Sequence, residues 1–172
     1  MKLTAVLTPL AFASAALADG AAIIGALAEV NDATVQLGEK VGSWTGDILG
    51  TLPIVAESTS LLIKVKKGTK TAEESEALDF LQAIDVATAT YGLVGSVNAT
   101  MTNLINAKPK FDKLLMSPII FINLGLQRKA TTEMSEAIIS KVPVELQAIA
   151  QDLVAPIDAS FELAIDAFHP LD

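Results

Sequence analysis

The sequence predicts an all-α protein built as an antiparallel bundle of about five helices. Apolar residues recur at intervals of three and four along most of the chain, which places them on one face of a helix. No segment alternates apolar and polar residues as a half-buried strand does. Hydrophobic residues make up 51% of the chain but aromatic residues only 5%, so we expect a core of Ala, Leu, Ile and Val.

The first 18 residues have the pattern of a secretory signal peptide. Lys2 precedes an apolar stretch, and Ala16-Leu17-Ala18 forms an A-x-A cleavage site. Residues 19–172 then form a single helical-bundle domain, which we expect to be secreted, extracellular or in the cell wall. No other apolar run approaches the ~20 residues of a spanning helix, so we expect no transmembrane anchor.

Two helices are predicted in the first part of the domain. The first covers 23–44, where the apolar spacing is 4, 3, 4, 3, 4 and 3, and Gly46 is its expected C-cap. The second covers 48–66, and a lysine cluster at 64–67 suits the negative end of its dipole. Glycines recur at 38, 42, 46 and 50. We favour caps and a loop for them over a close-packed helix face, since each helix-interior glycine costs ~1 kcal/mol.

Gly68 is expected to break the chain before a long third helix at 72–107. Thr71 and Glu74 form a capping box at its start. Its apolar stripe is expected to comprise Phe80, Ile84, Ala87, Tyr91, Val94, Val97, Met101 and Leu104.

The fourth helix is expected to begin at Ser117-Pro118 and to end at Pro143. Its opening, SPIIFINLGL, is apolar in every direction around a helix. This predicts either a central helix buried on all sides or one that lines an apolar cavity. The fifth helix covers 146–168, with a kink expected at Pro156.

The residues needed for most catalysis are missing. The chain has one histidine, His169, and no cysteine, phosphate loop or G-x-S-x-G motif. We therefore predict a protein that is not an enzyme and has no catalytic residues, no metal site and no cofactor. The net charge is −8, or −9 without Lys2 of the signal peptide (11 basic against 20 acidic residues), which argues against nucleic-acid binding. Asn98 lies in an Asn-Ala-Thr sequon and is a candidate glycosylation site.

Four stretches resemble one known family: IIGALAEVNDATVQLGEKVGSWTGD, LLIKVKKGT, VNATMTNLINAKPKFDKL and IDASFELAIDAF. They are similar to the fungal cell-wall mannoproteins, also called the hydrophobic surface-binding protein A family, over about residues 22–168. The resemblance implies a secreted or wall-associated helical domain. Some members of the family enclose long-chain fatty acids between helices, and others adsorb to hydrophobic solids. The sequence lacks the second copy, the Ser/Thr-rich stalk and the anchor signal of larger members, so covalent attachment to the wall is not expected.

A fatty acid or another apolar small molecule is therefore the expected ligand, held in a central apolar cavity. Each methylene that leaves water contributes ~0.8 kcal/mol. Tyr91 is the only tyrosine; its hydroxyl is expected to bind the ligand head group or to pair with the backbone. Two alternatives stay open: a protein that coats hydrophobic surfaces, and a structural mannoprotein without a ligand whose partner is wall polysaccharide. The residues expected to contact the ligand are Phe80, Ile84, Tyr91, Val94, Leu115, Ile119, Ile122, Leu126, Leu153, Ile157 and Phe161.

Overall fold

The computed structural model describes residues 10–170, with side chains from residue 19 onward. Within these residues the chain is helical and contains no strand, so the prediction of an all-α fold is confirmed. Residues 1–9 of the predicted signal peptide lie outside the described residues, and removal of the peptide stays a prediction. The elements are α1 (Leu10–Ser43), α2 (Thr51–Glu74), α3 (Phe80–Lys113), α4 (Ser117–Ile139), the short 3-10 helix η1 (Val144–Leu146) and α5 (Gln147–Phe168).

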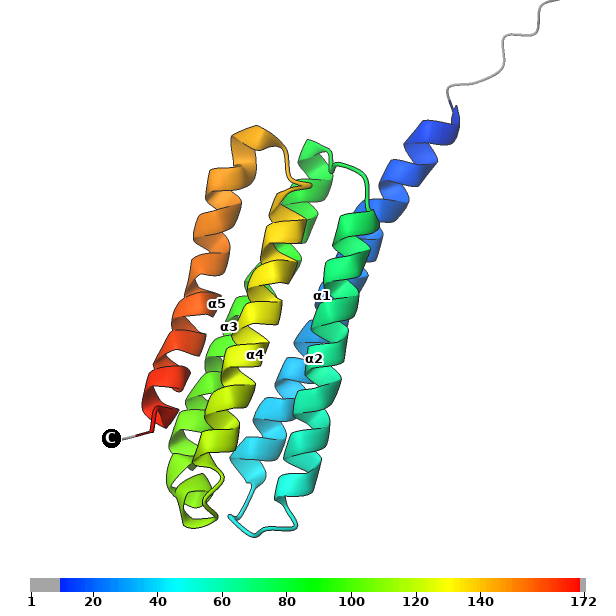
Figure 1. The fold of residues 1–172 in the computed structure, drawn as a ribbon. Coiled ribbons are helices and arrows are strands. Elements are labelled where there is room, and N and C mark those ends of the chain that lie inside the picture. Colours follow the sequence, from blue (N-terminus) through cyan, green and yellow to red (C-terminus); the bar gives the residue numbers. More distant parts are fainter. Residues whose placement is uncertain (1–9, 171–172) are drawn as a thin grey trace, which may run out of the picture.

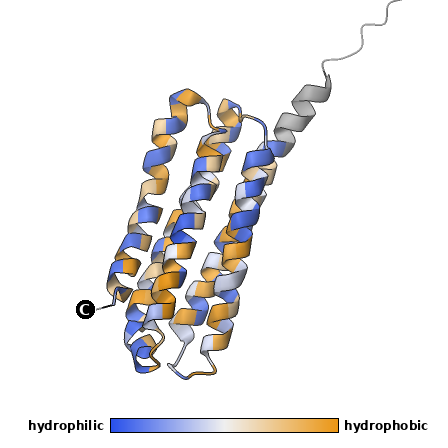
Figure 2. Cartoon of the chain, in the orientation of Figure 1, coloured by the Kyte–Doolittle hydropathy of each residue, from blue (hydrophilic) through white to orange (hydrophobic). Residues whose placement is uncertain are grey.

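The five helices form a closed ring in cross-section. Each helix runs opposite to the one before it in the chain (Figure 1). The pairs that pack closely are α1 with α2, α2 with α4, α4 with α5, α5 with α3, and α3 with α1. Apolar and polar residues are interleaved along every helix, so each helix can turn an apolar side to the ring's interior (Figure 2).

One end of the ring is closed by aromatic side chains. Phe111 is 0% exposed and lies between Trp44 and Phe168, with ring centroids 4.5 Å and 5.9 Å away. The indole of Trp44 donates a hydrogen bond to the carbonyl of Asp47 at 2.9 Å, which holds the loop after α1 against this cluster. The interior is therefore filled at the end where α1, α3 and α5 finish.

The boundary between the second and third helices differs from the prediction. Gly68 lies inside α2, which continues to Glu74. It is buried there against Met134, and a larger residue would not fit, because a Cβ at this position would lie 2.6 Å from Cε of Met134. The lysines at 64–67 are consequently in the body of α2, and the interpretation of this cluster as a helix end is wrong.

The third helix begins later than predicted and ends later. Its capping box is made by Asp79 and Gln82, where each backbone N–H donates to the other residue's side chain at 2.8 Å. The predicted box at Thr71 and Glu74 is wrong, because those residues belong to α2. At the other end, α3 continues through Pro109 to Lys113, which carries Phe111 into the aromatic cluster.

The buried face of α3 is rotated from the predicted stripe over its first half. The interior positions are Ala83, Val86, Thr90 and Leu93, whereas Tyr91 is 73% exposed. From Val97 onward the predicted and observed faces agree. The prediction followed the largest side chains, but small residues occupy the interior along this half.

The all-apolar opening of α4 is not buried on all sides, which corrects that expectation. Ile120 and Leu124 face the core, while Ile119, Ile122 and Leu126 are each more than half exposed. This exposed row adjoins α2, because Ser58 of α2 donates a hydrogen bond to Asn123 of α4 at 2.7 Å.

Two of the recurring glycines lie in a loop, and the other two lie on a close-packed helix face. Gly46, with φ of +98°, and Gly50 lie in the connection between α1 and α2, as favoured. Gly38 and Gly42 lie inside α1, against Thr100 and Asn103 of α3. There the hydroxyl of Thr100 donates to the carbonyl of Thr34 at 2.9 Å, so the two backbones approach closely.

Gly38→Ala is expected to destabilise the protein by about 1–3 kcal/mol, the usual cost of overpacking. Its Cβ would lie 2.5 Å from Oγ1 of Thr100, which is buried and cannot move away freely. Gly25→Ala is the matched control on the same helix, since nothing lies within 4 Å of its Cβ position. That change should stabilise the protein by up to ~1 kcal/mol. Urea unfolding of both variants measures the difference, and equal shifts in the same direction would contradict close approach at Gly38.

α3 is long and apolar enough to cross a membrane by length and composition alone. This helix was not expected to qualify, because its apolar residues do not form one uninterrupted run. In the bundle, 33% of the apolar 18-residue stretch of α3 that meets this criterion is buried.

Candidate functional site

An apolar cavity of about 160 Å³ lies inside the ring, in the half away from the aromatic cluster. It is bounded mainly by the first half of α3, the second half of α4 and the first half of α5, with α1 and α2 contributing one wall. Only three of the lining residues carry a polar side-chain atom: Thr90, Thr131 and Ser135. The remaining lining residues are Leu27, Val30, Val65, Ala83, Ile84, Val86, Ala87, Leu93, Met134, Ile138, Ile139, Val142, Leu146, Ile149, Ala150, Leu153, Val154 and Ile157.

The space exists here because small residues face the interior. Ala83, Val86 and Thr90 of α3 are buried but too short to fill the middle of a five-membered ring. Voids larger than a water molecule are few in close-packed proteins, so an apolar void of this size is a feature that calls for an explanation.

A cleft of about 520 Å³ runs along the outside of the α4–α5 seam. It shares part of its lining with the cavity, so the two spaces adjoin between these two helices. The shared residues are Thr131, Ser135, Ile139, Val154 and Ile157.

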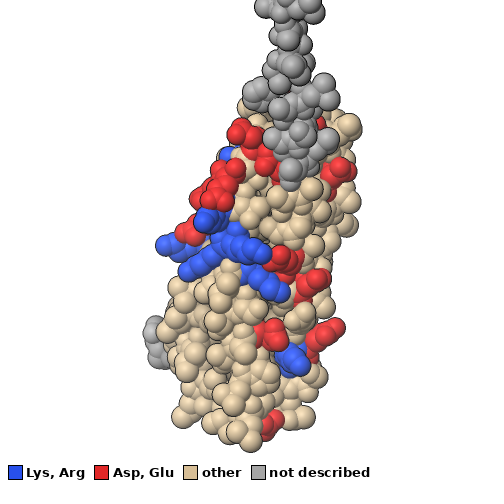
Figure 3. All heavy atoms as spheres, turned by 90° about the vertical axis from the view of Figure 1, so that its right-hand side faces the viewer, with Lys and Arg blue, Asp and Glu red and all other residues tan. Residues whose placement is uncertain are grey.

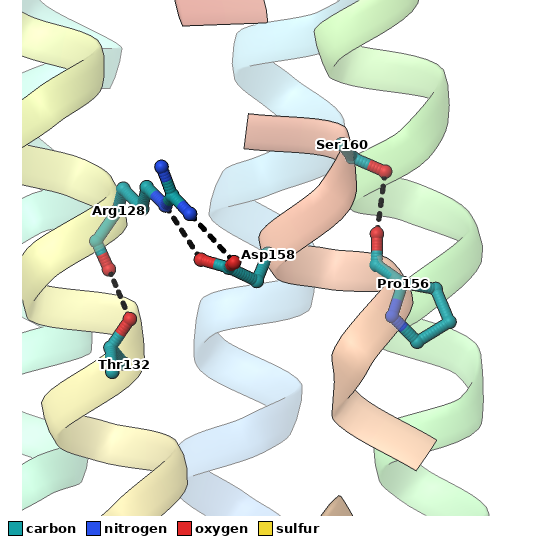
Figure 4. A network of polar contacts seen from close by, with 5 residues as sticks. All are labelled: Arg128, Thr132, Pro156, Asp158 and Ser160. Atoms are coloured by element: carbon teal, nitrogen blue, oxygen red, sulfur yellow. Dashed lines mark hydrogen bonds and ion pairs between the residues drawn. The ribbon is translucent and has the colours of Figure 1, made fainter. Parts of the chain in front are cut away.

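A bidentate ion pair joins α4 to α5 across this cleft. Nε of Arg128 donates to Oδ1 of Asp158 at 2.6 Å, and Nη2 donates to Oδ2 at 2.7 Å (Figure 4). The hydrogen bonds from Arg128 hold the pKa of the Asp158 carboxyl below its usual value of 3.8. The same bonds raise the pKa of Arg128, so both groups are charged at neutral pH.

Asp158→Asn is expected to destabilise the protein by about 0.5–1 kcal/mol at pH 7, a value limited by solvent screening of a half-exposed pair. Because the folded pKa of Asp158 is lowered, its contribution is present above the ordinary carboxyl pKa of about 4 and is lost as the pH falls below it. Urea unfolding at pH 7 and pH 3 should therefore show a smaller difference between variant and parent at pH 3. A difference that grows toward low pH would contradict this assignment.

The structure brings three of the eleven expected ligand contacts to the cavity: Ile84, Leu153 and Ile157. Phe161 is buried and lines the outer cleft. Val94 is half-buried and lines neither space. The other six are exposed on the outside of the ring: Phe80, Tyr91, Leu115, Ile119, Ile122 and Leu126.

Sequence reasoning missed most of the lining, although a signal for it was present. The positions 83, 86, 90, 93, 97, 100, 104, 107 and 111 follow the same three–four spacing as the predicted stripe. These positions coincide with the observed buried face of α3. The predicted stripe carries the larger side chains in the first half of α3, and the observed buried face carries smaller ones there, next to the cavity.

Comparison with known proteins places the chain in a family. The family model for hydrophobic surface binding protein A matches residues 20–140. Cell wall mannoprotein 1 of Aspergillus fumigatus is 26% identical over 145 residues, and that of Aspergillus flavus is 25% identical over 139 residues. These alignments cover 84% and 81% of this chain but 50% of each relative, so the chain spans about half the length of these relatives.

Two solved structures share the fold. The crystal structure of Afmp4p in complex with palmitic acid has a TM-score of 0.84 and 22% identity, covering 87% of this chain and 99% of that one. Ligand binding domain 1 of Penicillium marneffei MP1 protein, complexed with arachidonic acids, has a TM-score of 0.84 and 20% identity, covering 88% and 99%. The sequence match and the helical ring agree with the resemblance noted in the sequence: this chain belongs to the hydrophobic surface binding protein A family.

Proposed function

We propose that this protein is a lipid-binding protein that holds the tail of a long-chain fatty acid or a similar single-chain lipid in the cavity. The observation that carries the proposal is an apolar cavity that adjoins the α4–α5 cleft on the surface. The palmitic and arachidonic acids bound by proteins of the same fold support it. The proposed role is binding and carriage, without catalysis.

The size of the cavity indicates how a long tail would be accommodated. A cavity of about 160 Å³ resembles an engineered void that binds benzene, while ligand pockets usually measure about 300–1,000 Å³. The outer cleft adds about 520 Å³. A tail of sixteen carbons therefore extends from the cavity into the α4–α5 seam and parts the two helices there.

The α4–α5 seam is suited to opening because few polar bonds cross it. Two other seams carry buried bonds, such as Gln127 to the Ser58 carbonyl between α4 and α2, and Thr100 to the Thr34 carbonyl between α3 and α1. Across the described part of the α4–α5 seam, the hydrogen-bonded contact between side chains is the partly exposed pair of Arg128 and Asp158. We propose Ile84, Leu153 and Ile157 as contacts of the bound tail.

Titration of delipidated protein with palmitate and arachidonate tests the proposal. Tail burial at ~0.8 kcal/mol per methylene, reduced by ordering costs, is expected to give dissociation constants below ~10 μM. Native mass spectrometry of secreted protein should also show co-purifying lipid. Absence of saturable binding for both acids would contradict the proposal.

We propose that the protein acts outside the cell or in the cell wall and carries a glycan at Asn98. The names of the Aspergillus relatives support a wall location. Asn98 is exposed on α3 and is accessible for modification. Intact mass before and after treatment with an N-glycosidase tests occupancy of the site.

Adsorption to hydrophobic surfaces is a second candidate function, favoured by an exposed apolar face on α2 and α4. This face is formed by Leu52 and Val55 of α2 with Ile119, Ile122 and Leu126 of α4. Figure 3 views the molecule from the right-hand side of Figure 1: most of the visible Lys and Arg residues gather in one band, and the lower left of this face carries almost no charged residues. Depletion of the protein from solution by polystyrene beads, relative to a variant with Ile119 and Ile122 changed to Ser, tests this function separately from lipid binding.

A further inference from the structure

The two helices that form the mouth, where the cavity meets the cleft, are α4 and α5, and together they carry more acidic than basic residues. α5 carries four acidic residues and no lysine or arginine: Asp152, Asp158, Glu162 and Asp166. Of the charged residues that line the cleft, Arg128 is basic, and Glu136 and Asp158 are acidic.

The positive charge of Arg128 is already neutralised. Both Nε and Nη2 bond to Asp158, and the charges of Glu162 and Asp166 act on the guanidinium as well. Of the nearby lysines, Lys129 lies 3.9 Å from Glu133 along α4, and Lys141 points to α2, where it donates to the carbonyl of Glu73. A ligand carboxylate at the mouth would therefore meet a net negative potential.

Two hydroxyl groups stand where the cavity meets the cleft. Thr131 and Ser135 line both spaces, one turn apart on α4. Their neighbours Thr132 and Ser140 donate to backbone carbonyls of their own helix, at 3.0 Å and 2.7 Å. In the described residues the hydroxyls of Thr131 and Ser135 have no such partner, which leaves them able to donate to and accept from a ligand.

We propose that the mouth selects single-chain lipids whose head group carries no negative charge, such as a fatty alcohol, a fatty-acid ester or a protonated fatty acid. The hydroxyls of Thr131 and Ser135 bind the head, the tail occupies the cavity and the adjoining α4–α5 seam, and the acidic rim disfavours an ionised carboxylate. This inference rests on the proposed lipid binding and deepens it by naming the class of head group.

Competition with a fluorescent probe, 1-aminoanthracene, measures the selectivity directly. Hexadecanol and palmitate, which have equal tail lengths, are delivered from cyclodextrin to delipidated protein at pH 8.5 and pH 6. Hexadecanol is expected to bind about five- to tenfold more tightly than palmitate at pH 8.5, the effect of one or two like charges at partly screened distances. Palmitate should gain affinity as the pH falls and its carboxyl takes up a proton, while hexadecanol should not change.

Matched variants identify the residues responsible. Glu136→Gln should narrow the difference in affinity between the two ligands, and Glu39→Gln, an exposed position on α1 that lines neither space, should leave that difference unchanged. Changing Thr131 to Val and Ser135 to Ala together should weaken hexadecanol about tenfold, as expected for losing hydrogen bonds to a polar head.

The outcomes separate this inference from the function on which it rests. If both ligands bind and palmitate is equal or tighter at pH 8.5, the inference about the head group is overturned and lipid binding stands. If neither ligand binds, lipid binding itself fails. Binding of both ligands that is insensitive to Glu136→Gln and to the loss of both hydroxyls would also overturn the inference.

Discussion

Ala150→Phe is expected to weaken palmitate binding by at least about 100-fold. Ala150 is half-buried and lines the cavity, so the larger side chain occupies the space of the bound tail. Keeping about four methylenes out of the cavity removes ~3 kcal/mol, and each 1.4 kcal/mol is about tenfold in affinity. Titration of delipidated variant and parent with the same ligand measures the change.

Ala148→Phe is the control for this experiment. Ala148 is exposed on α5 two residues earlier, so the same substitution adds a ring outside the cavity. It should leave affinity within about twofold of the parent, while circular dichroism shows both variants to be folded. Equal affinity of the Ala150 variant and the parent would show that the tail does not occupy this cavity.

Phe111→Ala is expected to lower the free energy of unfolding by about 3–5 kcal/mol, the usual cost of removing a fully buried phenylalanine ring. The ring contacts both Trp44 and Phe168, so its removal leaves a void between α1, α3 and α5. Because this cluster lies at the opposite end of the ring from the cavity, lipid affinity of the folded variant should change little. Urea unfolding gives the stability, and titration below the transition gives the affinity.

The comparison variant is Phe80→Ala on the same helix. Phe80 is 59% exposed, so this change should cost less than about 0.5 kcal/mol. A loss below 1 kcal/mol for Phe111→Ala, or similar losses for both variants, would contradict the assignment of Phe111 as the closure of the bundle.

The fold could be predicted from the sequence because the helical spacing of apolar residues and the residues that begin or interrupt helices are local signals. Ser117-Pro118 marks the start of α4 as predicted, and Pro156 lies inside α5 as expected. The boundary at Gly68 could not be predicted, because glycine is kept inside α2 by contact with Met134, a residue far away in the chain. A distant contact overrode a local preference there.

The position of the site was harder to predict than the apolar nature of its lining. An apolar cavity was expected, and the cavity has an apolar lining, but the choice of residues favoured large side chains such as Tyr91 and Ile122. Empty interior space arises where side chains are short, and sequence spacing alone does not distinguish a small buried residue from a small exposed one. The path through the α4–α5 seam depends on which helices are neighbours in the ring, and this information lies in tertiary packing.

The order of helices around the ring has a consequence for how two molecules can associate. α5 is the last helix among the described residues and packs mainly on α3, α4 and the adjoining η1. Its removal leaves the other four helices joined by the α1–α2, α1–α3 and α2–α4 contacts. We therefore expect that two copies can exchange α5, each completing the other's ring, and that a lipid which separates α5 from α4 would favour such a domain swap.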